Sequence, residues 1–333
     1  MFGMATSRVV MAGQRLSLFK ELASGPATPE ELAARCGLIL EGTDHLLKCL
    51  AALGYLALKP EPQGLAALDF DNPSNGRYSL TRRARKWLVP SSTTYIGDFL
   101  EFNYDQWDWW AKLEDVVRAG ESHDIHDYPP DDPRWRRYIT AMFQLARLSA
   151  PEVARKLPLP SNPRRILDLA GGHGWFAAEI CKRHPGLNAT VIDLPGSVAI
   201  GSEIIARAGM NDRVKFTEGD ILQDNFAGSY DGALCFQIVH HFTPEQNLML
   251  FQKVHAAVKP GGTFVVLDYF PPTHPGRPDS SAFLGMHFYL TSGAAAYRRD
   301  EIEKWLTQAG FLRPKRIRLR SMPVQELYVS EKA

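Results

Sequence analysis

The residues with the clearest chemical potential in this sequence lie in one short turn. Asp168 ends a predicted apolar strand and is closely followed by three glycines, Gly171, Gly172 and Gly174. Glycine permits positive φ angles and lets the backbone approach a ligand closely. A helix predicted to begin at Trp175 would point its N-terminus at whatever lies on the glycines. This pattern predicts a ligand-binding turn between a strand and a helix.

A nicotinamide dinucleotide is the first ligand to consider for such a turn. Residues 172–177 match the G-x-G-x-x-A pattern, and Asp193 lies about where the ribose-binding acid of that pattern is expected. Three other features favour a different ligand. They are Asp168 before the glycines, Asp220 at the end of the third predicted strand, and the Lys-Pro-Gly-Gly turn at residues 259–262.

The elements that must position these acids alternate between strand and helix. Strands are expected at 165–169, 189–192, 214–218, 232–236 and 263–267, with helices at 175–183, 195–208, 244–258 and 299–308. A closing hairpin is expected from 316–320 and 325–329. Such alternation predicts a parallel, doubly wound sheet, which binds ligands at the carboxyl ends of its strands.

The first part of the chain has another pattern, short helices followed by two strands. Residues 28–31 form a capping box, that helix stops at Gly37, and a further helix is expected at 43–53. Strands at 55–58 and 77–81 then precede a helix at 82–88, which is the order of a winged helix. Because the helix at 43–53 offers only Lys48 as a cation, it is poorly suited to DNA and better suited to a second subunit.

The middle of the chain is helical and rich in aromatic residues, as expected of a wall for a planar apolar ligand. Its polar, proline-bearing segment at 121–133 is expected to be an exposed loop. We therefore divide the chain into a winged-helix domain at 1–90, a helical connector at 91–160 and an α/β domain at 161–333.

Composition excludes several other classes of protein. The chain has 333 residues, is 45% hydrophobic and has a formal net charge of +1, so no overall field favours nucleic acid or membrane partners. The four cysteines lack C-x-x-C spacing, which argues against a zinc site and a disulfide framework. No signal peptide or apolar run of membrane-spanning length is evident, so a cytoplasmic protein is expected.

Taken together, these motifs resemble those of class I S-adenosylmethionine-dependent methyltransferases. The sequences at 193–195, 219–221 and 240–245 further resemble the bacterial and plant small-molecule O-methyltransferases of the caffeate and hydroxyindole O-methyltransferase type. The resemblance covers nearly the whole chain. It implies a Rossmann-like class I methyltransferase doubly wound sheet, an N-terminal mainly helical winged-helix dimerisation domain, and a homodimer.

The resemblance also implies the methyl donor, S-adenosylmethionine, and its product, S-adenosylhomocysteine. Asp193 would accept from the ribose hydroxyls, Asp220 would approach the adenine amino group, and Asp168 would bind the amine directly or through water. Helix capping is the other interpretation of Asp193 and Asp220. The expected cofactor-binding residues are Asp168, Gly171, Gly172, Gly174, Asp193, Leu194, Gly219, Asp220, Ile221 and Gln237.

By the same resemblance, His240 is the general base and Asp268 the acid that orients it. A neutral imidazole with an ordinary pKa of about 6.5 suits removal of a proton from a hydroxyl nucleophile. The sequence departs from the family where the plant enzymes carry a lysine before the histidine motif, which is Phe236 or Gln237 here, and at two positions that concern the base. His241 replaces an aspartate after the base, so His241 or neither histidine is an alternative base. A second acid of the plant enzymes falls on Ala296.

The acceptor is expected to be an aromatic or polyketide-like small molecule that carries a hydroxyl, and no metal is expected. The resemblance places the acceptor pocket at Tyr138, Met142, His241, Phe283, Met286 and His287. Two other functions stay open. One is a C-methyltransferase or other S-adenosylmethionine chemistry on the same scaffold, and the other is a ligand-sensing, DNA-binding regulator without catalysis.

Overall fold

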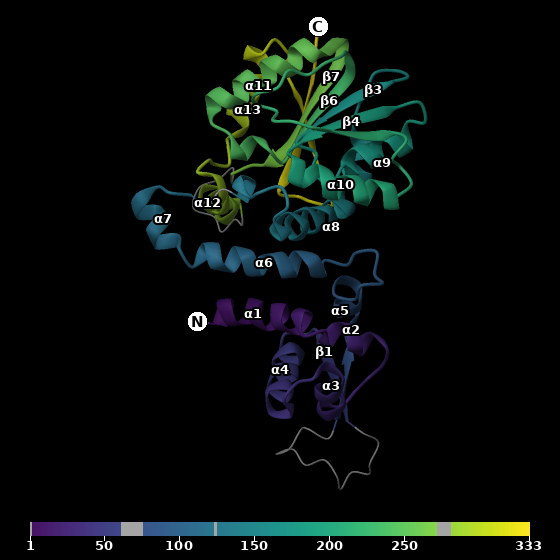
Figure 1. The fold of residues 1–333 in the computed structure, drawn as a ribbon, viewed down its shortest axis with the longest axis vertical. Helices are drawn as coiled ribbons and strands as arrows, with labels where there is room; N and C mark the ends of the chain where they lie inside the picture. The colour runs from purple at the N-terminus through teal and green to yellow at the C-terminus, as the bar shows by residue number, and fades with distance from the viewer. Residues whose placement is uncertain (1, 61–75, 123–124, 272–280) are drawn as a thin grey trace. The chain divides into compact units, whose positions relative to one another are not determined.

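The computed structural model describes residues 2–60, 76–122, 125–271 and 281–333. The chain divides into two compact units, Met1–Gln106 and Trp107–Ala333 (Figure 1). The three-part division at residues 90 and 160 stays a prediction beside this two-part division. No helix within the described residues is long and apolar enough to cross a membrane.

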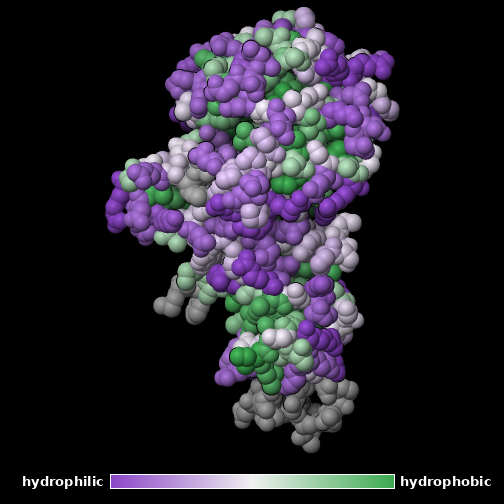
Figure 2. Space-filling model, viewed as in Figure 1, coloured by the Kyte–Doolittle hydropathy of each residue, from purple (hydrophilic) through white to green (hydrophobic). Residues whose placement is uncertain are grey.

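The first unit has the order of elements that the sequence predicted, helices followed by a two-stranded antiparallel sheet. Its elements are α1 (Phe2–Arg15), α2 (Leu18–Ala23), α3 (Pro29–Cys36), α4 (Leu40–Ala52), β1 (Leu56–Pro60), β2 (Gly76–Leu80), α5 (Arg82–Trp87) and the start of α6 (Gly97–Trp110). Phe19, Leu32 and Leu47 are fully buried in the core of this unit. In contrast, Ile39 and Leu40 at the start of α4 are 81% and 44% exposed, and apolar surface gathers over α4 in Figure 2.

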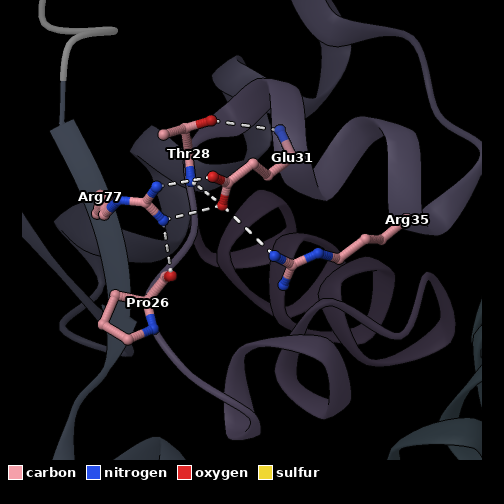
Figure 3. A network of polar contacts seen from close by, with 5 residues as sticks. All are labelled: Pro26, Thr28, Glu31, Arg35 and Arg77. Carbon is pink, nitrogen blue, oxygen red and sulfur yellow. Dashed lines mark hydrogen bonds and ion pairs between the residues drawn. The ribbon is translucent and has the colours of Figure 1, made fainter.

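Local sequence signals set the bounds of α3. Thr28 accepts from the backbone N–H of Glu31 at 3.3 Å, and Gly37 ends the helix at φ 66°. Arg77 on β2 then donates to both carboxylate oxygens of Glu31, at 2.9 and 2.7 Å, and to the carbonyl of Pro26 (Figure 3). The hydrogen bond from Arg77 lowers the pKa of Glu31. This network joins β2 to α3.

The second unit is built on a seven-stranded sheet with the order β5-β4-β3-β6-β7-β9-β8. Its strands are β3 (Arg165–Leu169), β4 (Asn188–Asp193), β5 (Val214–Glu218), β6 (Tyr230–Phe236), β7 (Val258–Tyr269), β8 (Lys315–Arg318) and β9 (Gln325–Glu331). The first five are parallel neighbours, as expected. β9 runs antiparallel between β7 and β8, so the sheet is mixed.

Helices cover both faces of this sheet, which explains why its central strands are apolar on both sides. The second unit contains the helices α7 (Leu113–Ala119), α8 (Pro133–Lys156), α9 (Trp175–Arg183), α10 (Pro195–Arg207), α11 (Pro244–Ala257), α12 (Ser281–Ser292) and α13 (Arg299–Gln308), of which α8, α9, α10, α11 and α13 pack on the sheet. One core joins α8, α9 and α10 to the sheet, and the other joins α11 and α13 to it. Ile166 belongs to the first core and Leu167 to the second.

Two parts of the second unit differ from the expectation. The segment at 121–133 is not simply an exposed loop, because it contains the 3-10 helix η2 (Ile125–Asp127), and the ring of His126 packs against other aromatic rings. The stretch around Phe283–Leu290, for which no element was expected, lies in α12. Both differences depend on contacts between segments that are far apart in sequence.

Candidate active site

The glycine turn after β3 has the backbone geometry that its sequence predicts. Ala170, Gly172 and Gly174 all have positive φ, at 49°, 52° and 65°. A Cβ on Gly171 would lie 2.6 Å from the carboxyl group of Asp168, so no larger residue fits there without movement. His173 accepts from the backbone N–H of Trp175 at 3.0 Å and so helps to begin α9. The turn therefore exposes backbone rather than side chains at the carboxyl end of β3.

Asp193, the last residue of β4, braces this turn. One carboxylate oxygen accepts from the backbone N–H of Gly172 at 2.7 Å, and the other accepts from the N–H of Leu194 at 2.7 Å. The side chain is buried, with 8% of the residue exposed. Asp193 thus accepts a hydrogen bond from the backbone just before α10 and also fixes the backbone of the glycine turn.

Asp168 is the unusual acid of the site, because it is buried without full hydrogen bonding. Only 2% of the residue is exposed, and its Oδ2 has no hydrogen-bond partner among the described residues. Burial, together with the nearby charge of Asp193, raises the pKa of Asp168 to about 8. A pair of buried acids of this kind favours a ligand that carries a positive charge, because the charge would offset both the burial and the repulsion.

The remaining cofactor candidates lie at the ends of neighbouring strands. After β5, Asp220 is exposed and accepts from the N–H of Leu222 at 2.8 Å, while Ile221 is buried. Gly219 donates to the backbone carbonyl of Asp193 at 2.9 Å, which ties the ends of β5 and β4 together. After β6, Gln237 has a φ of 57°. The ten candidates therefore follow four adjacent strands, β5, β4, β3 and β6.

His240 and Asp268 form a buried pair beside these strand ends. His240 lies in the 3-10 helix η3 (Val239–His241) after β6, and Asp268 lies near the end of β7. The distance from His240 Nδ1 to Asp268 Oδ1 is 2.7 Å, and the two residues are 4% and 1% exposed. Because a carboxylate only accepts, Nδ1 carries the proton and Nε2 is the basic nitrogen.

The turn that carries His240 is held from both ends. Asn247, which is fully buried on α11, donates from Nδ2 to the carbonyls of Val239 at 3.0 Å and Phe242 at 3.2 Å. The hydroxyl of Tyr297 donates to the same carbonyl of Phe242 at 2.5 Å. These bonds fix the backbone on each side of the two histidines, so their rings have defined positions.

Aromatic rings surround His240 and His241. The ring of His240 stacks on Phe288 from α12, with centroids 3.7 Å apart and planes 16° apart. His241 lies 4.3 Å from His240 and meets His126 edge-on at 4.5 Å, and His126 meets Tyr138 at 5.9 Å. We call His126, Tyr138, His240, His241 and Phe288 the aromatic cluster. It offers flat, largely apolar surface next to the buried histidine–aspartate pair.

Only some of the expected pocket residues belong to this cluster. Tyr138 and His241 do, and His287 lies at its edge, where its ring contacts Phe288 as well as Trp109 and Trp110. Phe283 is 72% exposed. Met142 and Met286 are half-buried on α8 and α12. Sequence reasoning did not find His126, because nothing local connects that residue to His241, more than a hundred positions later.

His241 and His287 are held in the neutral form. Burial, followed by the proximity of His240, His126 and His287, lowers the pKa of His241 well below its ordinary value. Burial and then His240 lower the pKa of His287 to about 4. At neutral pH these imidazoles therefore act as polar, uncharged groups. Within the four described ranges, no three His, Cys, Asp or Glu side chains are grouped as metal ligands.

Solved structures share the fold of this chain. Human N-acetylserotonin methyltransferase in complex with SAM matches with a TM-score of 0.86 and 20% identity, over 100% of this chain and 95% of that one. PigF with SAH matches with a TM-score of 0.83 and 22% identity, over 100% and 97%. The second unit thus has the class I methyltransferase fold.

Sequence comparison gives the family. Residues 110–312 match the O-methyltransferase domain, and residues 1–90 match the O-methyltransferase dimerisation domain. The 3-hydroxy-5-methyl-1-naphthoate 3-O-methyltransferase of Streptomyces sahachiroi is 28% identical over 330 residues, 96% of this chain and 90% of that protein. Acetylserotonin O-methyltransferase of Bos taurus is 24% identical over 324 residues, 93% and 90% of the two chains. The chain belongs to the O-methyltransferase family.

Membership confirms the class of enzyme and the methyl donor that the sequence predicted. The chain is an S-adenosylmethionine-dependent methyltransferase with an N-terminal dimerisation domain. The roles of individual site residues and the identity of the acceptor stay predictions.

Proposed function

We propose that this enzyme transfers the methyl group of S-adenosylmethionine to a hydroxyl of an aromatic or polyketide-like small molecule, with His240 as general base. The observation that carries the proposal is the 2.7 Å contact between His240 Nδ1 and Asp268 Oδ1 in a buried position. The relative from Streptomyces sahachiroi is named for methyl transfer to a naphthoate hydroxyl, which supports the same class of acceptor.

The residues at the strand ends fit the methyl donor. The Oδ2 of Asp168, which has no partner among the described residues, would bind the amine of the donor. Asp193 would bind the ribose hydroxyls of the donor in place of its hydrogen bond from the N–H of Gly172. Gly171, Gly172 and Gly174 would hold the methionyl part against backbone, with Leu194 beside the ribose. Gly219, Asp220, Ile221 and Gln237 would surround the adenine. When bound, S-adenosylmethionine supplies a methyl carbon that is activated by the attached sulfonium.

On the acceptor side, His240 would accept the hydroxyl proton at Nε2. Asp268 keeps Nδ1 protonated, fixes the ring and would stabilise the imidazolium that forms, as the acid of a hydrolytic triad does. The aromatic cluster would hold a planar acceptor. The other expected pocket residues lie on the helices that carry Tyr138 and Phe288, with Met142 on α8 and Phe283, Met286 and His287 on α12. Methyl transfer needs the nucleophile to be aligned and deprotonated, and both tasks fall to side chains of this chain.

Replacing His240 by alanine tests the proposal. We expect His240→Ala to bind S-adenosylmethionine like the wild type in calorimetry while turnover falls by about 10²–10⁴-fold. Turnover is measured as S-adenosylhomocysteine formed with a panel of naphthols and hydroxynaphthoates, and His45→Ala, an exposed histidine on α4, is the matched control. Near-wild-type turnover would remove His240 from the role of base. Because the proposed chemistry needs no metal, EDTA should leave turnover unchanged.

Methyl transfer to carbon or nitrogen is the second candidate. Relatives of similar length include the N,N-dimethyltransferase OxyT of Streptomyces rimosus and an L-tyrosine C(3)-methyltransferase of Streptomyces lavendulae. The position of the second acid of the plant enzymes is Ala296 here, which leaves His240 with Asp268 as the acid beside it. Mass spectrometry and carbon NMR of the product distinguish an O-methyl from a C-methyl or N-methyl group.

A further inference from the structure

His241 is half-buried, and its Nδ1 is a buried polar atom to which the proposed methyl transfer assigns no bond. Its Nδ1 has no hydrogen-bond partner among the described residues, although the neighbouring His240 is paired with Asp268. Most buried polar atoms in proteins are hydrogen-bonded, and an unpaired one costs stability. The position is nevertheless well defined, because Asn247 and Tyr297 fix the backbone of the turn.

The surroundings of His241 indicate what kind of group would complete it. His126 meets the ring edge-on, Phe288 lies on another side, and Tyr138 lies behind His126. These neighbours are flat and supply no charge of opposite sign, and burial lowers the pKa of His241. A neutral imidazole has one N–H and one lone pair, so it pairs well with a hydroxyl, carbonyl or carboxylate oxygen.

The spacing of the two histidines relates this oxygen to the reacting one. The centroids of His240 and His241 are 4.3 Å apart, and the rings are tilted by 49°. An acceptor whose hydroxyl meets His240 would therefore lie within reach of His241 as well.

We propose that His241 is a specificity-determining residue that hydrogen-bonds a second oxygen of the acceptor, on the ring atom next to the methylated hydroxyl. The acceptor class is then an aromatic ring with two neighbouring oxygen-bearing substituents. This inference rests on the proposed function in one respect, the assignment of the methylated hydroxyl to His240. A site built to hydrogen-bond a substrate oxygen discriminates strongly against an analogue that lacks it.

Binding of matched naphthols tests the inference without relying on turnover. Enzyme loaded with S-adenosylhomocysteine is titrated calorimetrically with 2-naphthol, 2,3-dihydroxynaphthalene and 3-hydroxy-2-naphthoate. We expect at least one of the two doubly substituted probes to bind about 10-fold tighter than 2-naphthol. The dihydroxy probe and the carboxylate probe distinguish a neutral from an anionic second oxygen. Equal affinity of the wild type for all three would overturn the inference.

Variants at position 241 assign the preference to this side chain. His241→Phe keeps an aromatic ring but removes both ring nitrogens, so we expect it to lose most of the preference for the doubly substituted probes over 2-naphthol. His241→Asn places an amide near the position of Nδ1 and should retain the preference. His45→Phe on α4 is the matched control. A preference that survives in His241→Phe would contradict the role. Turnover of His240→Ala tests the proposed function and the binding preference tests His241, so failure of one proposal is distinguishable from failure of the other.

Discussion

At the scale of single residues, the two oxygens of the Asp268 carboxylate differ in their hydrogen bonds. Its Oδ1 accepts both from His240 Nδ1 and from the backbone N–H of Tyr269 at 2.7 Å, whereas Oδ2 has no partner among the described residues. The backbone contact fixes the carboxylate, and the carboxylate in turn fixes the imidazole. The base is therefore positioned by β7 as well as by its own turn.

The first prediction concerns that carboxylate. Asp268→Asn keeps the shape but removes the charge that stabilises the imidazolium, and its amide can favour the wrong histidine tautomer. We expect turnover to fall by about 10²-fold or more while donor binding is unchanged. The measurement is S-adenosylhomocysteine formation beside calorimetry with S-adenosylmethionine. Asp300→Asn, at an exposed acid paired with Arg298, is the control. Unaltered turnover in Asp268→Asn would argue against any role of the pair in catalysis.

A second residue-scale prediction follows from the pKa of Asp168. Burial raises this pKa to about 8 from 3.8, so the folded protein holds a proton that the unfolded chain releases above about pH 4. Asp168 therefore costs the free enzyme stability as pH rises between these values, by up to about 1.4 kcal/mol per pH unit. Asp168→Asn cannot ionise and avoids this loss.

The measurement is thermal unfolding of Asp168→Asn and wild type at pH 5 and pH 8 without ligand. We expect the unfolding midpoint of Asp168→Asn, relative to that of the wild type, to be higher at pH 8 than at pH 5. We also expect the variant to bind S-adenosylmethionine more weakly. An equal difference at both pH values would mean that Asp168 is ionised throughout. Asp300→Asn, at an exposed position, should follow the wild type at both pH values.

At the scale of elements, the sequence predicts what local signals determine. The bounds of α9 and α13 agree with the expectation, and α3 begins and ends at its predicted cap residues Thr28 and Gly37. These features depend on periodicity and capping within a few residues. The closing hairpin of β8 and β9 was predicted and is confirmed, but the pairing of β9 with β7 and the contact of His126 with His241 were not predicted, because each requires segments that are distant in sequence to meet.

The same division holds in the candidate site. Asp168, Asp193 and His240 lie at strand ends and could be placed from the order of strands alone, since parallel strands present their carboxyl ends at one edge. The unpaired nitrogen of His241 and the stacking of Phe288 on His240 could not, because they depend on how α12 and η2 pack beside the sheet. The motif therefore locates the donor site, and tertiary packing shapes the acceptor site.

An element-scale prediction concerns Gly201, in the middle of α10. A Cβ there would collide with the backbone carbonyl of Gly172 and would lie 2.7 Å from the ring of Phe216. Gly201→Ala should therefore push α10 away from the glycine turn and weaken S-adenosylmethionine binding by about 10-fold or more, as overpacking against backbone is costly. Gly42→Ala on α4, where a Cβ would meet nothing within 4 Å, is the control. Wild-type affinity in Gly201→Ala would show that the turn does not depend on this close approach.

At the scale of the whole molecule, residues 1–90 match a dimerisation domain. This match accounts for the exposed apolar side chains of the first unit. Met4 on α1 is 69% exposed and Ile39 before α4 is 81% exposed, and apolar surface gathers over α4 in Figure 2. A large apolar patch on a protein surface often marks a protein–protein contact. A second copy of this chain is the partner that the dimerisation domain implies.

Two substitutions test whether the exposed apolar side chains of the first unit form the dimer interface, and both are chosen to keep the fold. Ile39 is the N-cap of α4 without a side-chain cap, and Met4 lies in the first turn of α1, which has no acid. Aspartate is favourable at both positions in an isolated helix, so Met4→Asp with Ile39→Asp should keep the fold while charging the interface. We expect the wild type to sediment as a dimer of 37.3 kDa chains and the double variant to dissociate at low micromolar concentration. Leu312→Asp, at an exposed apolar position after α13, should stay dimeric. A double variant as dimeric as the wild type would place the subunit contact elsewhere on the dimerisation domain.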